Sequence, residues 1–511
     1  MAQDRPLDVV VIGGGVNGTG IARDAAGRGL SVLLCEKSDL GSGTSSASTK
    51  LIHGGLRYLE QYEFRLVRES LMEREVLLRA APHIIWPMRF VLPHNKSLRP
   101  AWMIRLGLFL YDHLGGRKLL PASRGIKLSD HPSGAPLKDE MTKGFVYSDC
   151  WVQDARLVVL NAIDARERGA EILTRTECLS ARRAGELWEI ELKDLRSGQT
   201  RSVQARALVN AAGPWVASVL EQRLGSNRAS GLRMIKGSHI VVPAMFDHGY
   251  AYIFQNPDGR IVFAIPYEDR FTLIGTTDVE YKGDPAEVKI SDDEVSYLCK
   301  AVNEYFKSGI APEDVVWTYA GVRPLYDDAS QTASTVTRDY VLDLDEQKGQ
   351  APLLNVFGGK ITTFRKLAEH AMEKLCPLLD CRTPDWTAEA VLPGGDLGQG
   401  KDGVNFNAFV DAFREQNPWL PADLARRYAR NYGARAAMIL GDAGSVGDLG
   451  RHLGDGIYEA ELNYLVEQEW VVEAADLLWR RSKLGLHISD ETAAQIGTWL
   501  GQHGLSDRRV G

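Results

Sequence analysis

The glycine-rich segment VVVIGGGVNGTG near the start of the chain constrains the fold more than any other stretch. Gly13, Gly15 and Gly18 form the pattern G-x-G-x-x-G, which is a weak signal when it stands alone. Here an apolar strand is expected before it and a helix after it, and Glu36 ends the next strand about 20 residues further on. This context predicts the opening β-α-β unit of a dinucleotide-binding fold and disfavours a glycine turn without a ligand.

Each part of this pattern has a physical role in holding a dinucleotide. Gly13 allows the turn, Gly15 lets a pyrophosphate approach the backbone, and Gly18 lets the helix pack closely on the strand. The N-terminus of the helix directs partial positive charge at the phosphates. A carboxylate at Glu36 accepts hydrogen bonds from a ribose diol. The pattern does not distinguish NAD from FAD.

Three further segments favour FAD, bound along its length. The loop GTSSAST carries hydroxyl groups that suit a pyrophosphate or a ribityl chain, with a flexible polar loop as the alternative. Residues 208–215 and 356–364 are expected strand ends rich in small residues, and a helix from near Ile361, with Lys360, suits the negative charge of a reduced flavin. Nothing in the sequence requires a covalent link. The residues predicted to contact FAD are Gly13, Gly14, Gly15, Asn17, Gly18, Glu36, Lys37, Thr44, Ser45, Ser46, Ser48, Lys50, Leu51, Ala212, Gly213, Gly359, Lys360, Ile361 and Thr362.

Composition excludes several other classes of function. A net charge of −7 leaves no excess of positive charge to neutralise a nucleic-acid duplex, so we expect no nucleic-acid partner. The 6 cysteines form no CxxC pair, and no His or Cys cluster has zinc spacing, so no metal site is expected. No apolar run reaches the length of a membrane-spanning helix. The first expected strand begins so early that no signal peptide is predicted.

The hydrophobic pattern predicts an α/β fold in which two regions interleave over residues 1–390. A Rossmann-like FAD-binding domain alternates with an antiparallel β-sheet substrate domain, because the period switches to two over 237–277. Residues 82–148 look irregular because prolines interrupt them, and Asp154 is expected to cap a helix. The expected FAD-binding segments are about 1–80, 150–215 and 318–390, and the expected substrate or cap segments about 81–149 and 216–317.

A C-terminal α-helical domain is expected over residues 391–511, after the glycine-rich linker VLPGGDLGQGKDG. One of its helices is expected to run through EAELNYLVEQEWVVEAADLLWRR without a break. Its tryptophans are interpreted as core residues rather than contacts to a cofactor or lipid. These tryptophans are Trp419, Trp470, Trp479 and Trp499.

Longer segments carry a more specific signal than the glycine pattern. SSASTKLIHGGLRYLE, IKGSHIVVP, IGTTDVEYKGDP, WTYAGVRPL and FGGKITTFRKLAEHA together resemble the aerobic, FAD-dependent glycerol-3-phosphate dehydrogenases, within the D-amino-acid-oxidase-like flavoproteins. The resemblance runs from about residue 8 into the C-terminal region. It implies oxidation of sn-glycerol 3-phosphate to dihydroxyacetone phosphate by hydride transfer to FAD, with electrons passed to ubiquinone or another membrane quinone. Because no calcium-binding loop is found, the resemblance is to the bacterial form.

The resemblance also implies a pocket for the phosphate of a three-carbon alcohol. Guanidinium groups suit phosphate oxygens, and Arg323 also joins the expected catalytic set. His53 and His239 are the candidates for the base that takes the hydroxyl proton. A cationic pocket that lowers the pKa of the hydroxyl, with no single essential base, is the alternative. The residues expected to bind the substrate are Arg57, Tyr58, Arg323 and Lys360.

A quinone acceptor implies contact with a bilayer, and residues 94–118 are the first candidate. Arg105 and Asp112 lie two turns apart, so they share one helix face and leave the other face apolar. Such a segment suits the bilayer surface, with a core helix under a loop as the alternative. The basic-aromatic segment LLWRRSKLGLH is a second candidate. The expected location is cytoplasmic, attached to the inner face of the cell membrane. The basic residues of the first segment are Lys96, Arg99, Arg105, Arg117 and Lys118.

Three alternatives remain open at this point, and a homodimer is an option for the assembly. A glycerol-3-phosphate oxidase would use the same fold and substrate but reduce oxygen to hydrogen peroxide. An amine or amino-acid oxidase of the same superfamily would prefer a substrate that bears a carboxylate. A flavin-loaded redox sensor would bind a partner through its C-terminal domain, and glycerol 3-phosphate would not reduce it.

Overall fold

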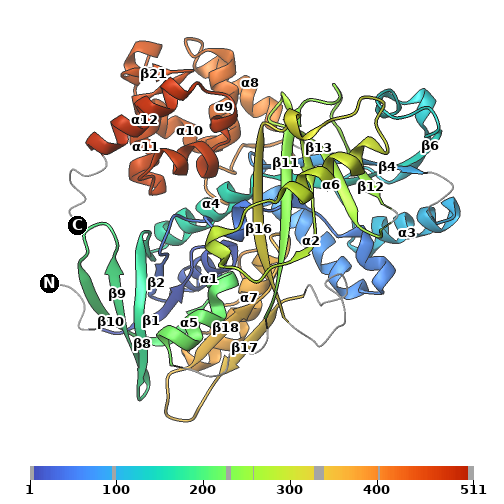
Figure 1. Ribbon diagram of the computed structural model, residues 1–511. Coiled ribbons are helices and arrows are strands. Elements are labelled where there is room, and N and C mark those ends of the chain that lie inside the picture. The colour runs from blue at the N-terminus through green and yellow to red at the C-terminus, as the bar shows by residue number, and fades with distance from the viewer. Residues whose placement is uncertain are drawn as a thin grey trace.

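The computed structural model describes residues 5–94, 99–225, 232–256, 258–326, 339–400 and 403–503. Figure 1 shows two β-sheet regions side by side, with a C-terminal helical domain lying over the first of them. The chain passes between the two regions more than once, so each sheet combines strands from separate parts of the sequence. The predicted α/β class, with interleaved sheets and a helical C-terminal domain, is confirmed.

The first sheet has eight strands within the described residues, and five of them run parallel in the order β18-β10-β1-β2-β7. Three helices pack into one buried core with this sheet. Because β1, β10 and β18 are parallel, the segments that follow Ile12, Asn210 and Phe357 meet at one edge. The strands are β1 (Leu7–Ile12), β2 (Val32–Cys35), β7 (Glu171–Leu173), β8 (Thr176–Ala184), β9 (Leu187–Asp194), β10 (Thr200–Asn210), β17 (Val341–Asp345) and β18 (Leu353–Phe357), and the helices are α1 (Val16–Gly27), α4 (Asp154–Glu167) and α7 (Phe364–Leu375), with α5 (Val216–Arg223) on the other face.

The second sheet has ten strands in the described part of the chain and is mostly antiparallel. The four strands predicted between residues 237 and 277 are β11 to β14 of this sheet. The strands are β3 (Leu51–Ile52), β4 (Ile85–His94), β5 (Arg124–Lys127), β6 (Lys143–Val152), β11 (Leu232–Pro243), β12 (Tyr250–Gln255), β13 (Ile261–Tyr267), β14 (Phe271–Gly275), β15 (Val279–Glu280) and β16 (Trp317–Tyr326), and the helices of this region are α2 (Phe64–Ala80), α3 (Ala101–Leu114) and α6 (Asp292–Asn303).

Three sequence-based expectations about the two sheet regions were wrong. Residues 82–148 are not irregular: β4 pairs along its length with β6, and Pro87 and Pro93 lie outside the part of β4 that also pairs with β12. Residues 318–326, expected in the FAD-binding part, belong to β16 and pair with β11. Asp154 is the first residue of α4 rather than its cap, because its carboxylate turns toward Lys50.

The C-terminal domain has its own hydrophobic core. The single helix expected over its middle is interrupted, because Trp470 has a left-handed backbone with φ of 58° and ends α11. Trp470 and Trp499 are buried, and Trp419 and Trp479 are partly buried against the core of this domain, as expected. The elements are α8 (Phe406–Gln416), α9 (Ala422–Tyr432), α10 (Ala436–Leu440), α11 (Glu459–Glu469), a π-helical turn (Asp476–Arg481) and α12 (Asp490–His503), with the short strand pairs β19 (Gln399–Gly400) with β20 (Gly403–Val404), and β21 (His452–Gly454) with β22 (Ile457–Tyr458).

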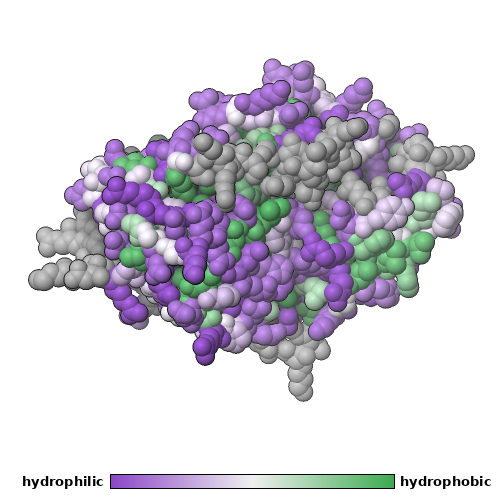
Figure 2. All heavy atoms as spheres, turned by 90° about the horizontal axis from the view of Figure 1, so that it is seen from below, coloured by the Kyte–Doolittle hydropathy of each residue, from purple (hydrophilic) through white to green (hydrophobic). Residues whose placement is uncertain are grey.

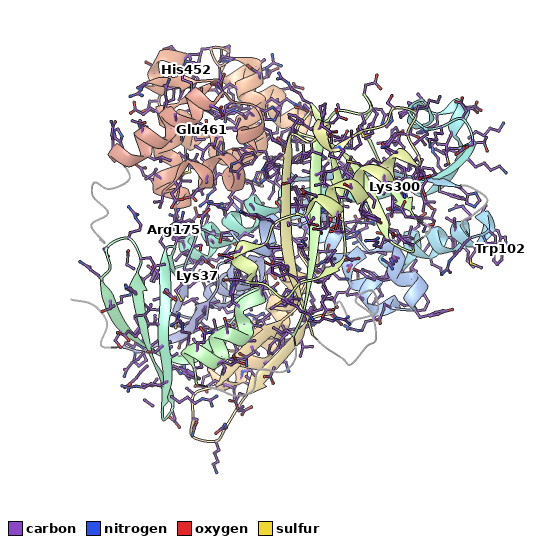
Figure 3. The ribbon with its side chains drawn as sticks, viewed as in Figure 1. Lys37, Trp102, Arg175, Lys300, His452 and Glu461 are labelled. Atoms are coloured by element: carbon purple, nitrogen blue, oxygen red, sulfur yellow. The ribbon has the colours of Figure 1, made fainter. Side chains whose placement is uncertain are left out.

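Buried ion pairs join this domain to the first sheet region. The guanidinium of Arg481 donates to Asp39 at 2.6 and 2.8 Å, and both side chains are fully buried. Arg156 of α4 pairs with Glu469 at the end of α11. Arg175 lies below the C-terminal domain in Figure 3 and donates to Asp476 at 2.9 Å. Fully buried charges need partners, so these contacts hold the two regions in one arrangement.

Candidate active site

A cavity of about 1080 Å³ lies where the two sheets and the C-terminal domain meet. Its walls include the segments after β1, β10 and β18, the hydroxyl-rich loop after β2, and strands β11 and β16. Pockets for small ligands usually have volumes of roughly 300 to 1,000 Å³. The cavity is therefore large enough for an extended cofactor together with a small substrate.

The glycine turn after β1 forms one end of the cavity. Gly13 has φ of 111°, and a Cβ placed there would lie 2.5 Å from the carbonyl oxygen of Ala211, so only glycine fits. A Cβ on Gly18 would lie 2.0 Å from the carbonyl oxygen of Gly13, which explains the close packing of α1 on the turn. Both glycines therefore have the roles that the sequence pattern predicted.

Glu36 stands at the end of β2, beside this turn. Its carboxylate accepts hydrogen bonds from the backbone N–H groups of Gly14 and Ser38, both at 2.7 Å. Burial raises the pKa of the Glu36 carboxyl, and these two N–H groups oppose the rise. The ammonium of Lys37 lies 4.6 Å from the centre of the Trp215 ring, across the mouth of the cavity. Glu36, Lys37 and Trp215 thus form a wall with an acceptor, a cation and an aromatic face.

The hydroxyl-rich loop packs against the N-terminus of α1. Ser45 Oγ accepts a hydrogen bond from the backbone N–H of Val16 at 3.0 Å, and Thr44 Oγ1 donates to the carbonyl of Val322 at 2.6 Å. Lys50 does not face the cavity as expected: its ammonium lies 2.9 Å from both carboxylate oxygens of Asp154. Both side chains of that ion pair are 1% exposed. Lys50 therefore anchors the loop instead of lining the cavity.

The turn after β18 forms a third part of the wall. Gly359 has φ of 95°, and a Cβ there would lie 2.8 Å from the Asn17 side chain, which itself donates to the carbonyl of Gly358 at 3.1 Å. The following helix, α7, begins at Phe364, three residues later than the sequence suggested, because residues 361–363 form a turn first. Asn17 thus ties the first and third glycine turns together.

Most of the predicted cofactor contacts line the cavity. The predicted contacts that do not line the cavity are Gly14, Gly18 and Lys50. Gly14 lies beneath the Glu36 side chain, and Gly18 is buried where α1 packs on the glycine turn. The predicted residues that do line it are Gly13, Gly15, Asn17, Glu36, Lys37, Thr44, Ser45, Ser46, Ser48, Leu51, Ala212, Gly213, Gly359, Lys360, Ile361 and Thr362.

The predicted substrate residues line the same cavity. Arg57 and Tyr58 come from the segment after β3, and the ammonium of Lys360 lies 3.8 Å from the centre of the Tyr58 ring. Arg323 of β16 donates to Asp278 and, at 3.3 Å, to the carbonyl of Thr277. The three cationic side chains of Arg57, Lys360 and Arg323 all line the cavity, so it suits an anion.

His239 lies in β11 and lines the cavity. Its Nε2 is 3.0 Å from Thr49 Oγ1, and its ring stacks on Tyr319 with centroids 4.7 Å apart. Burial lowers the pKa of His239 well below its usual value, and the nearby cations Lys50 and Arg323 lower it further. The imidazole is therefore neutral at neutral pH, which is the form that accepts a proton.

His53, the other predicted candidate, also lines the cavity. Its ring meets Phe263 edge-on with centroids 6.4 Å apart, and its backbone N–H donates to Thr362 Oγ1 at 3.3 Å. Both histidines are thus brought to one cavity, although 186 residues of sequence separate them in a chain of 511 (239 − 53).

Several cavity residues were not anticipated from the sequence. Thr49 lines the cavity beside His239, and Tyr319 donates to the carbonyl of Ser48 at 2.8 Å. The C-terminal domain supplies Trp479, Arg480 and Lys483. The segment LLWRRSKLGLH, considered above for the bilayer, therefore faces the cavity through these residues. Only the basic-aromatic composition of the segment pointed to it, and composition does not reveal which surface it faces.

These walls fit FAD. Three glycine turns meet at one sheet edge, α1 directs its N-terminus there, and hydroxyl groups continue along the wall toward His239. Among the described residues, no group of three or more His, Cys, Asp or Glu side chains is arranged to hold a metal ion. In the same part of the chain, no helix has the length and apolar character that crossing a bilayer requires.

Family models and similar proteins of known name agree on the family to which this chain belongs. The model for "FAD dependent oxidoreductase" matches residues 8–357, and the model for "C-terminal domain of alpha-glycerophosphate oxidase" matches residues 386–500. The chain is 56% identical over 493 residues to a glycerol-3-phosphate dehydrogenase of Pseudomonas aeruginosa, covering 96% of this chain and 94% of that protein. It is 53% identical over 500 residues to a D-erythritol 1-phosphate dehydrogenase of Brucella abortus, covering 98% and 99%.

A solved structure extends this similarity to three dimensions. The glycerol-3-phosphate dehydrogenase from Bacillus halodurans, in complex with FAD, superposes with a TM-score of 0.75 at 28% identity. The superposition covers 98% of this chain and 94% of that one. The likeness therefore includes the C-terminal domain as well as both sheet regions.

Proposed function

The chain belongs to the family of aerobic, FAD-dependent glycerol-3-phosphate dehydrogenases, and from this premise we propose that it oxidises sn-glycerol 3-phosphate to dihydroxyacetone phosphate. The observation that carries the proposal is the convergence of Arg57, Lys360 and Arg323 with a neutral histidine in the cavity that fits FAD. The cofactor is FAD, held without a covalent link. Electrons then pass to a membrane quinone.

Within this cavity, some residues bind the phosphate of the substrate and others bind the hydroxyl at its reacting carbon. Arg57 and Lys360 bind the phosphate, and Tyr58 holds the Lys360 ammonium beneath its ring. Arg323, oriented by Asp278, binds the substrate oxygen nearest to the reacting carbon. Bound FAD supplies the acceptor for the hydride that leaves C2. The cationic wall also favours loss of the hydroxyl proton.

His239 is the group that receives this proton. Its Nε2 bonds Thr49 Oγ1, and Thr49 lines the cavity, so the threonine hydroxyl passes the proton from substrate to imidazole. Stacking on Tyr319 fixes the ring plane. His53 faces the cavity directly and contacts the substrate from the side of Phe263.

The test is an anaerobic titration of the flavin absorbance in mild detergent. Adding sn-glycerol 3-phosphate is expected to bleach the visible flavin band, and adding a quinone analogue is expected to restore it. Recovery with oxygen alone, together with one hydrogen peroxide per turnover, would instead identify a glycerol-3-phosphate oxidase. A folded, flavin-loaded sample that does not bleach would refute the substrate assignment.

A second substrate of the same class is favoured by one observation. The Brucella abortus relative named for D-erythritol 1-phosphate is 53% identical to this chain. Both substrates carry a phosphate on a polyol, so the cation set described above serves either one. Comparing kcat/KM for sn-glycerol 3-phosphate and D-erythritol 1-phosphate on the same preparation decides between them.

The bilayer contact is proposed for α3. The face of α3 turned away from its buried residues Leu108 and Tyr111 exposes Trp102, Leu106 and Phe109, which are 66%, 51% and 49% exposed. Figure 2 shows hydrophobic surface gathered at the end of the molecule where α3 lies, and in Figure 3 Trp102 points away from the protein. Lys96, one of the basic residues expected here, lies outside the described residues. An exposed apolar helix face with flanking basic residues suits the headgroup region of a membrane on the cytoplasmic side.

The polar face of α3 is fixed to the protein. Arg105 donates to Ser123 Oγ at 2.8 Å, and Asp112 accepts from both the backbone and the hydroxyl of Ser123. The helix therefore keeps its apolar face outward, which supports the surface role over that of a core helix under a loop.

A further inference from the structure

The C-terminal domain contributes one cation to the cavity that no carboxylate neutralises. Arg480 and Arg481 are both paired, since each donates to Asp39 and Arg480 also donates to Asp476. Within the described part of the chain, Lys483 makes no ion pair, and its ammonium donates only to the carbonyl of Trp479. Its side chain lines the cavity beside Trp479.

An ammonium in such a place is costly unless a ligand compensates it. Burial and the neighbouring Lys50 lower the pKa of Lys483 to about 7. The other charged groups that face it are Asp154, Glu268 at the β13–β14 turn, and Arg480. Asp154 is already matched by Lys50 at 2.9 Å. A half-buried cation with no carboxylate partner of its own marks a position where an electron-rich ligand group is expected.

Aromatic contacts connect this part of the wall to the reaction centre. Trp479 stacks on Trp317 with ring centroids 4.4 Å apart, and Trp317 lies 5.2 Å from Tyr319. Tyr319 in turn stacks on His239 at 4.7 Å. Lys483 donates to the carbonyl of Trp479, so it lies at the end of the aromatic row that leads to His239.

We propose that Lys483 reaches from the C-terminal domain to bind the flavin ring of FAD, and that it stabilises the reduced cofactor. The inference rests on the proposal that FAD occupies this cavity. Reduction adds electrons to the ring, so a nearby positive charge favours the reduced over the oxidised state. The matched FAD oxidoreductase model ends at residue 357, so this contact comes from outside it.

Such a contact also couples the cofactor to the fold. If Lys483 binds FAD, then FAD binding strengthens docking of the C-terminal domain, and docking strengthens FAD binding by the same factor. The domain is then a part of the redox site as well as a cover for it.

The test is the midpoint potential of the bound flavin at pH 6, where the amine is protonated, measured by equilibration with reference dyes and a chemical reductant. For Lys483→Met we expect a tenfold loss in the preference for the reduced cofactor, which lowers the potential of a two-electron couple by about 30 mV. Lys483→Arg keeps the charge and should keep the potential. Lys307→Met, which removes an exposed lysine paired with Asp139, is the matched control and should leave it unchanged.

Three results would overturn the proposal. The first is an unchanged potential in Lys483→Met with FAD fully bound. The second is weaker FAD binding that is equal for both redox states, since this would place the lysine at the phosphates. The third is a 10- to 100-fold rise in KM for sn-glycerol 3-phosphate at unchanged potential, since this would assign the lysine to the substrate.

Folding and cofactor loading are controlled separately. Thermal unfolding followed by circular dichroism establishes that the variant is folded, and Lys483→Gln replaces Lys483→Met if the latter is not. All potentials are measured with FAD in excess of its dissociation constant. Because the reductant is chemical, the result is independent of whether sn-glycerol 3-phosphate is the substrate, and the two proposals can fail separately.

Discussion

The indole of Trp479 lies flat against the indole of Trp317, with ring centroids 4.4 Å apart and 16° between the planes. One ring belongs to the C-terminal domain and the other to β16 of the substrate sheet. The pair closes the cavity wall next to Tyr319 and His239. Docking of the C-terminal domain is thus part of the geometry of the site.

The first prediction concerns this pair. Changing Trp479→Ala, Trp317→Ala and both together is expected to give a coupling energy of about 0.5 to 1.5 kcal/mol, the usual value for stacked aromatic side chains. Urea unfolding followed by fluorescence measures it. A cycle that pairs Trp479→Ala with Phe409→Ala of α8 serves as the control and should be additive. Additivity in the first cycle would show that the stack contributes nothing.

The second prediction concerns the buried pair of Lys50 and Asp154. Asp154→Asn leaves the Lys50 ammonium buried without a charge partner, so we expect a loss of about 3 to 5 kcal/mol in the free energy of unfolding. The double variant Lys50→Met, Asp154→Leu should recover most of this loss. Urea unfolding measures both. A cost below about 1 kcal/mol for Asp154→Asn would mean that water reaches Lys50.

The third prediction is a pH dependence. The pKa of His239 is lowered, so its proton-accepting form persists at neutral pH and is lost only as the pH falls well below 6.5. The acid limb of log kcat/KM that reports this residue is therefore expected below pH 6.5, and His239→Asn should remove the limb and lower kcat by about 10²- to 10⁴-fold.

The matched variant for this measurement is His53→Asn. It should retain the acid limb and mainly raise KM, because His53 contacts the substrate in the proposed arrangement. If His53→Asn removes the limb and His239→Asn keeps it, the two assignments must be exchanged.

The fourth prediction concerns the phosphate. Arg57→Met and Lys360→Met each remove a charge-assisted contact worth about 1.5 to 3 kcal/mol, so KM for sn-glycerol 3-phosphate should rise on the order of 10- to 100-fold. Steady-state kinetics with a dye acceptor measure the effect. Arg65→Met is the control, because Arg65 is 70% exposed and pairs with surface carboxylates. A fall in kcat with no change in KM would contradict phosphate binding by these residues.

The fifth prediction concerns the membrane. Replacing Trp102, Leu106 and Phe109 together by serine should abolish sedimentation with vesicles of anionic lipid, because the apolar face of α3 is lost. Activity with a water-soluble dye acceptor should be unchanged. The control replaces three exposed apolar residues elsewhere by serine and should still bind vesicles. These control residues are Leu195, Val391 and Met438.

Much of the cofactor region could be predicted because its signals are local. Gly13 needs positive φ, α1 follows a short apolar strand, and the period of the hydrophobic residues separates the two sheets. Parallel pairing then brings the ends of β1, β10 and β18 to one edge, so widely separated glycine segments converge. The long segments shared with a known family added the substrate and the acceptor.

What failed were expectations about which partner a side chain meets. Lys50 was expected at the cofactor, but it is buried against Asp154, which in turn was expected to cap its own helix. Trp479 packs against the C-terminal core as expected, but its ring also lies on the cavity wall against Trp317, which the sequence did not indicate. Prolines suggested an irregular stretch at β4, but they fall where that strand lacks its second neighbour.

The sequence by itself determined the glycine turns, the alternation of strands and helices and the family, because backbone conformation and hydrophobic period are properties of neighbouring residues. Only the tertiary structure decided that Arg481 would pair with Asp39 and so hold its segment against the cofactor domain. It also decided that Lys483 would line the cavity without a carboxylate partner. Buried charges must find partners across the whole fold, and no local pattern states which partners remain available.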